Sequence, residues 1–246
     1  MDKWTDFEEY FRIVPAHNSE QIAQSQRLRY QVYCVEHAFL NAQDYPDQQE
    51  ADTYDTRAVH TMLQHRDSGH VVATVRLVLA NEAEPEQHFP IECCDILRRT
   101  IRDQEWRVPR HSVGEISRFA VSKEYRRRIK EAATSHGLSG TLVENNPACP
   151  TRRLPHIAVG LFKAVLAMSV NQHVTHWYAV MEPSLLRLLD QFGIKFAPIG
   201  PLVDFHGMRQ PCIAVADDVL ANLHRQRPDI WEFVTESGRI GIVKRA

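Results

Sequence analysis

The stretch Val113–Val121, VGEISRFAV, has the length and composition of a buried β-strand, yet it carries two charged residues. Its β-branched and aromatic residues favour a strand. Charged side chains are almost never fully buried unless they are paired, so Glu115 and Arg118 each need a partner, an edge or a cleft. Regular alternation would place these side chains on opposite faces of the strand. A β-bulge between them would direct both toward one cleft, and bulges are over-represented beside active sites.

Arginines also occur in two other apolar stretches. The stretch His70–Ala80, HVVATVRLVLA, is almost continuously hydrophobic, as expected of a central strand, and Arg76 lies within it. Arg29 lies four residues before Tyr33 in a segment with helical periodicity, so the two side chains share a helix face. Surface positions for Glu115 and Arg118, or a purely structural buried ion pair for Arg76, are the alternative interpretations.

Length, composition and charge exclude several classes of protein. At 246 residues, with 43% hydrophobic and 24% charged residues, the chain has the composition of a globular enzyme with a large core. A net charge of -2 argues against non-specific nucleic-acid binding. The acidic N-terminus lacks the apolar core of a signal peptide, and no run approaches the roughly 20 apolar residues of a membrane helix. We therefore expect no nucleic-acid partner, no integral membrane segment and a cytoplasmic location.

The cysteines and histidines indicate neither disulfides nor a metal site. The 5 cysteines are scattered and form no Cys-x-x-Cys pair, which indicates a reducing compartment. Cys149 lies in a predicted loop without the histidine context that a nucleophile needs. Among the 13 histidines, His173 and His176 form the only tight pair, which we interpret as surface chemistry. We expect no metal and no tightly bound cofactor.

The periodicity predicts an alternating order of strands and helices. A strand at 11–15 precedes a helix that Asn18 or Ser19 caps and that runs to about Val35. Residues 39–55 are polar, acidic and aperiodic, which predicts a binding loop or lid. The other predicted elements are strands at 58–65, 70–80 and 113–121, helices near 94–103 and at 156–171, a strand at 174–181, a helix at 183–193, strands at 194–199 and 211–216, and a helix at 217–227. We expect a single domain, 1–246, with a loop insertion near 134–155 that is rich in Gly, Pro and Asn.

This order of elements resembles the GNAT acetyltransferase fold, an α/β fold with a mixed central sheet flanked by helices. Individual residues resemble the signature of acyl-homoserine-lactone (autoinducer) synthases. That signature has an Arg-x3-Phe helix, a following Trp, an Asp-x2-Asp loop, a strand Arg, and Glu-x2-Arg-Phe on the fourth strand. The matching residues are Arg29, Tyr33, Phe39, Asp52, Asp55, Arg76, Glu115, Arg118 and Phe119. Tyr33 replaces the Phe of the signature and Phe39 its Trp, which keeps an aromatic wall.

A closer resemblance covers nearly the whole chain. The segments RLRYQVYCVEHAF, YDTRAVH, EISRFAVSKEYRRR, YAVMEPSLLRLL and VDFHGMRQP are similar to those of the PEP-CTERM/exosortase-system-associated acyltransferases. These form a bacterial branch of the same superfamily, related to N-acyl amino acid synthases. The resemblance implies an N-acyltransferase that moves a fatty acyl group from a thioester to the amine of an amino acid or a related small molecule.

The turn after the fourth strand departs from the usual GNAT pattern. That place usually has a Gly-containing turn whose backbone N–H groups hold a pyrophosphate at a helix N-terminus. Here Arg126, Arg127 and Arg128 occupy it without a glycine, so the same close backbone approach is not expected. Their side chains are candidates for binding the donor's phosphate or an acidic acyl carrier protein, with acyl-CoA as the other candidate donor. A solvated basic helix start is the alternative.

The residue types suggest which side chains would carry each step of an acyl transfer. Glu115, beside Arg118, is the candidate base for the acceptor amine, acting directly or through a water. Asp52 and Asp55 are candidates for holding a positively charged amine, unless they only cap or solvate their loop. Arg76 and Arg118 are expected to pair with those acids in an ion network. The other candidate substrate-binding residues are Arg29, Tyr33, Phe39 and Phe119.

Asp204, His206 and Arg209 form a second polar group, in a loop between two late predicted strands. The imidazole of His206 is a possible base, and a turn histidine that bonds to the backbone is an equal interpretation. These three residues are therefore a secondary candidate site.

Two other functions remain open at this stage. A homoserine-lactone synthase that uses S-adenosylmethionine would release a lactone. A non-catalytic acyl-binding or sensor module on the same scaffold would do no chemistry, since fold does not fix function. The intact set of acids and arginines argues against lost catalysis. The residues do not specify the acceptor, the acyl chain length or the oligomeric state.

Overall fold

The computed structural model describes residues 3–81, 83–84, 87–93, 108–127, 157–205 and 207–241. These residues fall into two compact units that are interleaved along the chain. The first unit comprises Met1–Ala51, His60–Val75 and Arg118–Ala164, and the second comprises Asp52–Val59, Arg76–Ser117 and Val165–Ala246. Each unit is described by itself. The expectation of a single domain remains a prediction.

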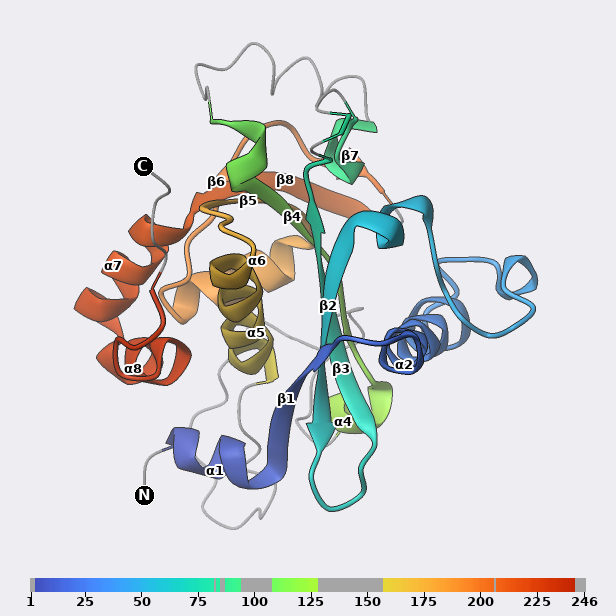
Figure 1. The fold of residues 1–246 in the computed structure, drawn as a ribbon, viewed down its shortest axis with the longest axis horizontal. Helices are drawn as coiled ribbons and strands as arrows, with labels where there is room; N and C mark the ends of the chain where they lie inside the picture. Colours follow the sequence, from blue (N-terminus) through green and yellow to red (C-terminus); the bar gives the residue numbers. More distant parts are fainter. Residues whose placement is uncertain are drawn as a thin grey trace. The chain divides into compact units, whose positions relative to one another are not determined.

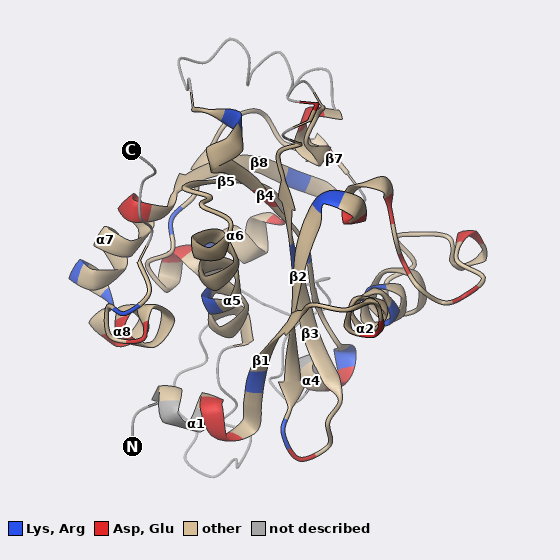
Figure 2. Ribbon diagram, viewed as in Figure 1, with Lys and Arg blue, Asp and Glu red and all other residues tan. Residues whose placement is uncertain are grey.

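The strands form a mixed sheet, which confirms the predicted fold class (Figure 1). Its strand order is β1 (Phe11–Ala16), β2 (Ala58–His65), β3 (Val71–Leu79), β4 (Val113–Val121), β5 (His176–Met181), β8 (Met208–Val215), β6 (Ala197–Pro198), with β7 (Val203–Asp204) paired to β8. The β4–β5 pair is parallel, whereas the β1–β2 and β5–β8 pairs are antiparallel. Charged residues interrupt the otherwise uncharged strands, as the blue and red segments of Figure 2 show.

The first unit begins with a helix and strand that pack beside each other. Its elements are α1 (Lys3–Tyr10), β1 (Phe11–Ala16), α2 (Ser19–Tyr30), the π-helix η1 (Gln31–Glu36), the 3-10 turn η2 (Ala42–Asp44), most of β2 (Ala58–His65) and of β3 (Val71–Leu79), the end of β4 (Val113–Val121) and α4 (Lys123–Arg127). Asn18 caps α2 because its side chain accepts a hydrogen bond from the backbone N–H of Gln21 at 2.9 Å. The helix then passes directly into η1, which confirms the predicted helix to about Val35.

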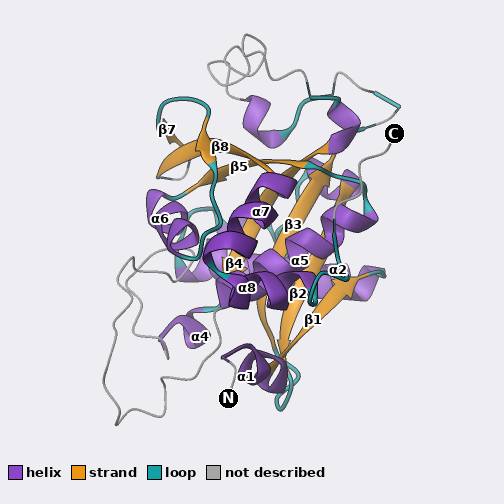
Figure 3. Cartoon of the chain, turned by 90° about the vertical axis from the view of Figure 1, so that its left-hand side faces the viewer, coloured by secondary structure: helices purple, strands orange, loops and turns teal. Residues whose placement is uncertain are grey.

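The second unit contains the remaining strands and the last helices. Its elements are the 3-10 turns η3 (Thr53–Arg57), η4 (Pro90–Cys93) and η5 (Arg110–Ser112), the strands β5 (His176–Met181), β6 (Ala197–Pro198), β7 (Val203–Asp204) and β8 (Met208–Val215), and the helices α6 (Pro183–Gln191), α7 (Ala216–Gln226) and α8 (Pro228–Thr235). Helices α7 and α8 pack against each other (Figure 3). The apolar helix α5 (Ile157–Asn171) runs from the first unit into the second. No helix in the described ranges is long and apolar enough to cross a bilayer.

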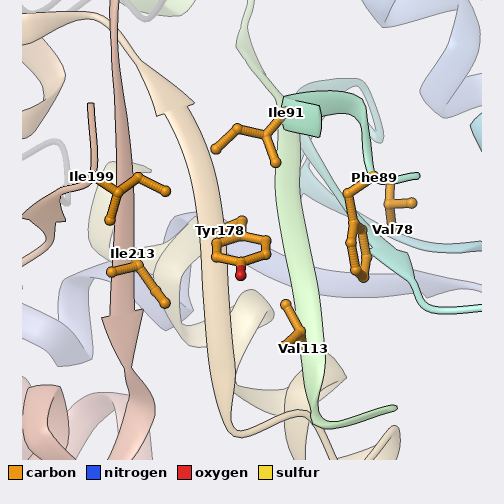
Figure 4. Close-up of a cluster of buried hydrophobic side chains, with 7 residues drawn as sticks. All are labelled: Val78, Phe89, Ile91, Val113, Tyr178, Ile199 and Ile213. Carbon is orange, nitrogen blue, oxygen red and sulfur yellow. The ribbon is translucent and has the colours of Figure 1, made fainter. Parts of the chain in front are cut away.

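A hydrophobic cluster in the second unit joins the turn η4 to the strands beside it (Figure 4). The ring of Tyr178 on β5 lies edge-on to the ring of Phe89, with 6.0 Å between centroids. The other buried members are Val78, Ile91, Val113, Ile199 and Ile213. This packing fixes the place of η4 relative to β4 and β5, which matters for the site.

Most predicted elements are present, and the differences have local causes. The strands predicted at 58–65 and 113–121 are confirmed, whereas the strand predicted at 194–199 is reduced to Ala197–Pro198. Pro198 has no N–H for a ladder, which favours a short edge strand. Helices α1 and α8 were missed, although Pro228 at the first position of α8 is a usual helix start. The helix predicted at 94–103 and the insertion near 134–155 lie outside the described residues.

The packing of α5 against α1 generates a test of the first unit. A Cβ atom built on Gly160 would lie 2.3 Å from Cζ of Phe7, whose ring is 1% exposed. We expect Gly160→Ala to lower the free energy of unfolding by about 1–3 kcal/mol through overpacking, even though alanine favours helix by about 1 kcal/mol. Urea unfolding of the variant and of wild type measures the difference.

A control and a rescue define this test. Gly241→Ala should change stability little, because no atom of the described residues lies within 4 Å of a Cβ built there. Adding Phe7→Leu to Gly160→Ala should recover part of the loss, since the smaller side chain removes the collision. A Gly160→Ala protein as stable as wild type would contradict this packing of Phe7.

Candidate active site

In the second unit, Arg76 and two aspartates form a buried ion network. The guanidinium of Arg76 donates to Oδ1 of Asp52 at 2.6 Å and to Oδ1 of Asp55 at 2.8 Å. It also donates to Oδ2 of Asp52 at 3.1 Å, and its Nε donates to the hydroxyl of Ser117 at 3.0 Å. The side chain of Arg76 is 1% exposed. The predicted pairing of Arg76 with both acids is therefore confirmed. The predicted pairing of Arg118 with the same acids stays a prediction, and the contacts of Arg118 described below are with Glu50.

The same aspartates form a capping box at the start of η3. The side chain of Asp52 accepts from the backbone N–H of Tyr54 at 2.9 Å, and that of Asp55 accepts from the N–H of Asp52 at 2.9 Å. The local sequence DTYD thus folds into a turn that points both carboxylates at one guanidinium. The capping interpretation of these acids is correct together with the ion-pair interpretation. Their contact with an acceptor amine stays a prediction.

In the first unit, Glu50 is a buried acid between two arginines. Nε of Arg29 donates to Oε2 of Glu50 at 2.5 Å. Nε of Arg118 donates to both carboxylate oxygens at 3.1 and 3.0 Å, and its Nη2 donates to Oε1 at 2.8 Å. The side chains of Arg29 and Glu50 are 0% exposed, whereas that of Arg118 is 22% exposed. Arg118 is thus the member of this cluster that reaches the surface of its unit.

Glu50 was missed in the sequence, although a signal for it exists. Arginines within two apolar strands require acids, and the acidic loop holds Glu50 two residues before Asp52. Burial pushes the pKa of Glu50 upward, but the charges and hydrogen bonds of Arg118 and Arg29 outweigh burial and lower it to about 2. The carboxylate is therefore charged at all ordinary pH values.

The backbone of β4 is irregular at Arg118, and the predicted β-bulge between Glu115 and Arg118 stays a prediction. Arg118 has a φ of 51°, a left-handed conformation that is uncommon for residues other than glycine. Such a residue interrupts the alternation of side chains along a strand. The guanidinium of Arg118 lies 5.8 Å from the ring centroid of Tyr33 in the π-helix, and π-helical turns often mark functional sites. That the side chains of Arg118 and Glu115 reach one cleft stays a prediction.

Glu115 is buried and held by the backbone of η4. Its side chain carries an oxygen, Oε2, that accepts from the N–H of Ile91 at 2.8 Å, and the residue is 3% exposed. Glu115 is in register with Tyr178 on the parallel strand β5, so the two side chains emerge on the same face. The parallel pairing continues for only one more pair, Ile116 with Ala179.

The aromatic candidates lie on three elements of the first unit. Tyr33 is in η1, Phe119 is buried on β4, and Phe39 follows η1. The ring of Phe39 stacks on that of His37 with 5.0 Å between centroids, because the left-handed Ala38 between them turns the chain back. Each of these three rings contributes an aromatic surface. That they form one wall of a substrate site remains a prediction.

The candidate donor-binding arginines are only partly described. Arg126 and Arg127 lie in α4, whereas Arg128 lies outside the described residues. The first backbone N–H of α4, that of Lys123, donates to both carboxylate oxygens of Glu36 at 3.1 and 2.9 Å. A carboxylate thus already accepts from the first backbone N–H of α4.

The secondary candidate group has structural contacts. The side chain of Asp204 accepts from the N–H of Gly207 at 3.1 Å, and Arg209 is paired with Glu182 and donates to the carbonyl oxygen of Phe205 at 3.3 Å. These contacts tie the β7–β8 turn to the residue before α6. His206 lies outside the described residues.

Comparisons with known proteins concern the fold. Residues 28–134 match the family model described as an acetyltransferase (GNAT) domain. A solved structure of TofI, in a ternary complex with an inhibitor and MTA, has a TM-score of 0.58 and 16% identity, and covers 87% of this chain and 96% of TofI. BjaI, a CoA-dependent acyl-homoserine lactone synthase solved with SAM and isopentyl-CoA, has a TM-score of 0.57 and 17% identity. The match covers 96% of this chain and 93% of BjaI. FeeM, an N-acyl amino acid synthase from uncultured soil microbes, has a TM-score of 0.55 and 14% identity. The match covers 87% of this chain and 96% of FeeM.

No curated protein sequence matches the chain. The match over residues 28–134 and the mixed sheet support an acyltransferase that has a GNAT domain in that part of the chain. The fold is similar to those of TofI, of the acyl-homoserine lactone synthase BjaI and of the N-acyl amino acid synthase FeeM.

The low pKa of Glu50 makes a stability prediction with a definite sign. Its folded-state pKa of about 2 lies below the ordinary 4.5, so its contribution is present above pH 4.5 and is lost as pH falls toward 2. That difference corresponds to roughly 3 kcal/mol. We expect Glu50→Gln to be destabilised at neutral pH by about 3–5 kcal/mol, because the buried Arg29 and the partly buried Arg118 lose this charged partner.

Urea unfolding as a function of pH measures both effects. The gap in unfolding free energy between wild type and Glu50→Gln should shrink between pH 4.5 and 2 as the wild-type carboxylate becomes protonated. Glu20→Gln is the matched control, because Glu20 also pairs with an arginine, Arg27, but is exposed. A gap that stays constant over this range would show that Glu50 contributes no charge-dependent stability.

Proposed function

We propose that the protein is an N-acyltransferase that moves a fatty acyl group from an acyl carrier protein or CoA thioester to the amine of an amino acid or a similar small molecule. The observation that carries this proposal is the buried carboxylate of Glu115 beside the point where β4 and β5 stop pairing, in a chain with a GNAT domain. The motifs shared with the PEP-CTERM/exosortase-associated acyltransferases support the same reaction.

The reaction requires one bond to form and one to break. The amine nitrogen bonds to the thioester carbonyl carbon, and the carbon–sulfur bond then breaks to give an amide and a thiolate. An ammonium acceptor loses two protons: Glu115 takes the first, directly or through a water, and passes it to solvent, and the second passes from the nitrogen to the thiolate sulfur. Glu115 returns to the carboxylate, so atoms and charge balance.

The end of the β4–β5 pairing supports a place for the thioester. After Ile116 and Ala179 the parallel register ends, so the backbone beyond it is released from the β4–β5 ladder. Backbone N–H groups freed in this way can polarise a thioester carbonyl as it gains negative charge. The left-handed backbone at Arg118 is the second irregularity in this part of β4.

Asp52 and Asp55 are the proposed contacts for the acceptor amine. Each of their four carboxylate oxygens accepts at least one hydrogen bond from Arg76 or a backbone N–H. A carboxylate oxygen has two lone pairs and can accept a further donor, so an ammonium group can add to this network. The aromatic side chains of Tyr33, Phe39 and Phe119 are the proposed apolar contacts of the substrates.

Acyl carrier protein is the proposed donor. The turn after β4 lacks glycine, and its first amide is already taken by the carboxylate of Glu36. A second anion at this amide would meet the charge of Glu36, which disfavours the pyrophosphate of CoA there. Arg126, Arg127 and Arg128 would instead meet the acidic surface or the phosphopantetheine phosphate of a carrier protein.

The first experiment identifies the product. Mass spectrometry of lipids from a heterologous bacterium that expresses the protein should show an N-acylated amino acid that is absent from cells expressing Glu115→Gln. Release of an acyl-homoserine lactone would instead assign the homoserine-lactone synthase reaction. Absence of any new acylated product would favour a non-catalytic acyl-binding module.

The role of Glu115 predicts a large kinetic effect. Glu115→Gln keeps an oxygen that can accept from the N–H of Ile91 but cannot take up a proton. We expect turnover to fall by roughly 10²–10⁴-fold at neutral pH, with the KM of the donor nearly unchanged. Raising the pH should partly restore the rate, because more of the amine is then deprotonated in solution. The variant must keep the wild-type melting temperature, and near-normal turnover in a folded variant would require another base.

The choice of donor predicts a salt effect. Acyl carrier protein should be used in preference to free acyl-CoA, and its kcat/KM should fall as ionic strength rises, because salt screens contacts between surface charges. Rates with both donors between low and high salt measure this preference. Replacing Arg126, Arg127 and Arg128 by alanine should remove the salt effect and leave the rate with acyl-CoA unchanged. Equal use of both donors without a salt effect would show that these arginines are a solvated helix start.

A further inference from the structure

One oxygen of Glu115 depends on a short turn that carries a second buried acid. The N–H of Ile91, which holds Oε2 of Glu115, belongs to η4. The next residue, Glu92, is also buried, and its Oε2 accepts from the N–H of Phe89 at 2.7 Å. The turn η4 thus presents one backbone donor to Glu115 and closes on itself through Glu92.

Arg110 holds this turn from the other side. Its Nη1 and Nη2 donate to Oε1 and Oε2 of Glu92 at 2.7 and 2.9 Å, which is the two-pronged geometry of the strongest arginine–carboxylate pairs. Nη2 also donates to the carbonyl oxygen of Gln87 at 2.9 Å. Arg110 lies in η5, three residues before β4 begins, so one side chain connects the approach to β4 with both ends of the segment 87–92.

We propose that Glu92 and Arg110 are positioning residues for the base Glu115 and act on it through the Ile91 amide. The inference deepens the proposed function and rests on it. In this proposal neither Glu92 nor Arg110 contacts a substrate. Their ion pair sets where the N–H of Ile91 points, and that N–H sets where one carboxylate oxygen of Glu115 lies.

A second arginine strengthens the same segment. The guanidinium of Arg57 lies 5.5 Å from the ring centroid of Phe89, and that of Arg110 lies 5.0 Å from it. Arg57 also donates to the carbonyl oxygens of Leu79 and His88. The residues from 87 to 92 are therefore held at nearly every position, which is the rigidity that a precisely placed base requires.

The charges around Glu115 make the pair with Arg110 necessary. Burial raises the pKa of Glu92, but hydrogen bonds from Arg110 and the Phe89 amide, with the charge of Arg110, reverse this and lower it overall. Glu92 is thus a second negative charge in the surroundings of the base. The groups that face Glu115 from the other elements are Tyr54 and Arg57 of η3, Tyr178 of β5 and Cys212 of β8.

The double variant Glu92→Gln/Arg110→Met tests this role without leaving a buried charge unpaired. We expect kcat to fall by about 10–100-fold, because a base misplaced by a fraction of an ångström loses its alignment. The KM values of donor and acceptor should stay within about twofold, since the pair touches neither substrate. The acidic limb of the kcat–pH profile should move to higher pH, because the charged carboxylate of Glu115 loses an aligned donor.

Two further variants separate positioning from stability. Arg110→Lys keeps the positive charge but cannot make the bidentate pair with the carboxylate. Its kcat, and the pH of its acidic limb, should therefore lie between those of wild type and of the double variant. Arg227→Met is the matched control, because Arg227 makes the same two-pronged pair with Asp229 in the same unit. The Arg227→Met variant should at most have a lower melting temperature. Its kcat–pH profile should be the same as that of wild type.

The possible results are distinguishable. A folded double variant, or a folded Arg110→Lys, with wild-type kcat and an unmoved acidic limb overturns the positioning role while the proposed function stands. Wild-type protein that transfers acyl groups without an acidic limb overturns Glu115 as base, and the positioning role with it. Wild-type protein that transfers no acyl group overturns the proposed function itself.

Discussion

The constraint on which the structure depends is that arginines inside an apolar protein must meet carboxylates. Glu50 meets two of them, Arg29 from α2 and Arg118 from β4, at a position without any exposed surface. Removing charges from water costs several kcal/mol per ion, and only close, well-aligned partners offset that cost. Because loss of one partner would strand a buried charge, the helix, the strand and the loop residue have to form their contacts together.

This constraint changes the interpretation of the acidic loop. Residues 39–55 have the composition of a free binding loop, yet Glu50 anchors it in one unit, and Asp52 and Asp55 anchor it to Arg76 in the other. The acids neutralise buried arginines and cap a turn before they meet any substrate. Under the proposed function, an acceptor amine would join a network that is already assembled, which avoids the entropy cost of ordering a loop on binding.

Sequence reasoning succeeds here where a property is local and fails where it depends on a distant partner. The strands at 58–65 and 113–121 follow from runs of β-branched and apolar residues, and the Asn18 cap follows from residue type. The pairing of Arg76 with Asp52 and Asp55 followed from a family signature, whereas Glu50 and Glu182, outside that signature, were missed. The turn η4 was missed because it is short and its Glu92–Arg110 pair spans 18 positions of sequence.

The contacts of Glu115 and Arg118 suggest why one strand can serve two tasks. Glu115 is held by the backbone N–H of Ile91, and a backbone donor is independent of side-chain identity at position 91. Arg118 is held by Glu50 and lies beside the aromatic ring of Tyr33. Under the proposed function, changes among the aromatic residues would therefore alter which substrate fits without disturbing the hydrogen bond that holds Glu115. This separation would allow Tyr33 and Phe39 to stand where the signature that the chain resembles has Phe and Trp, while Glu115 and Arg118 match it.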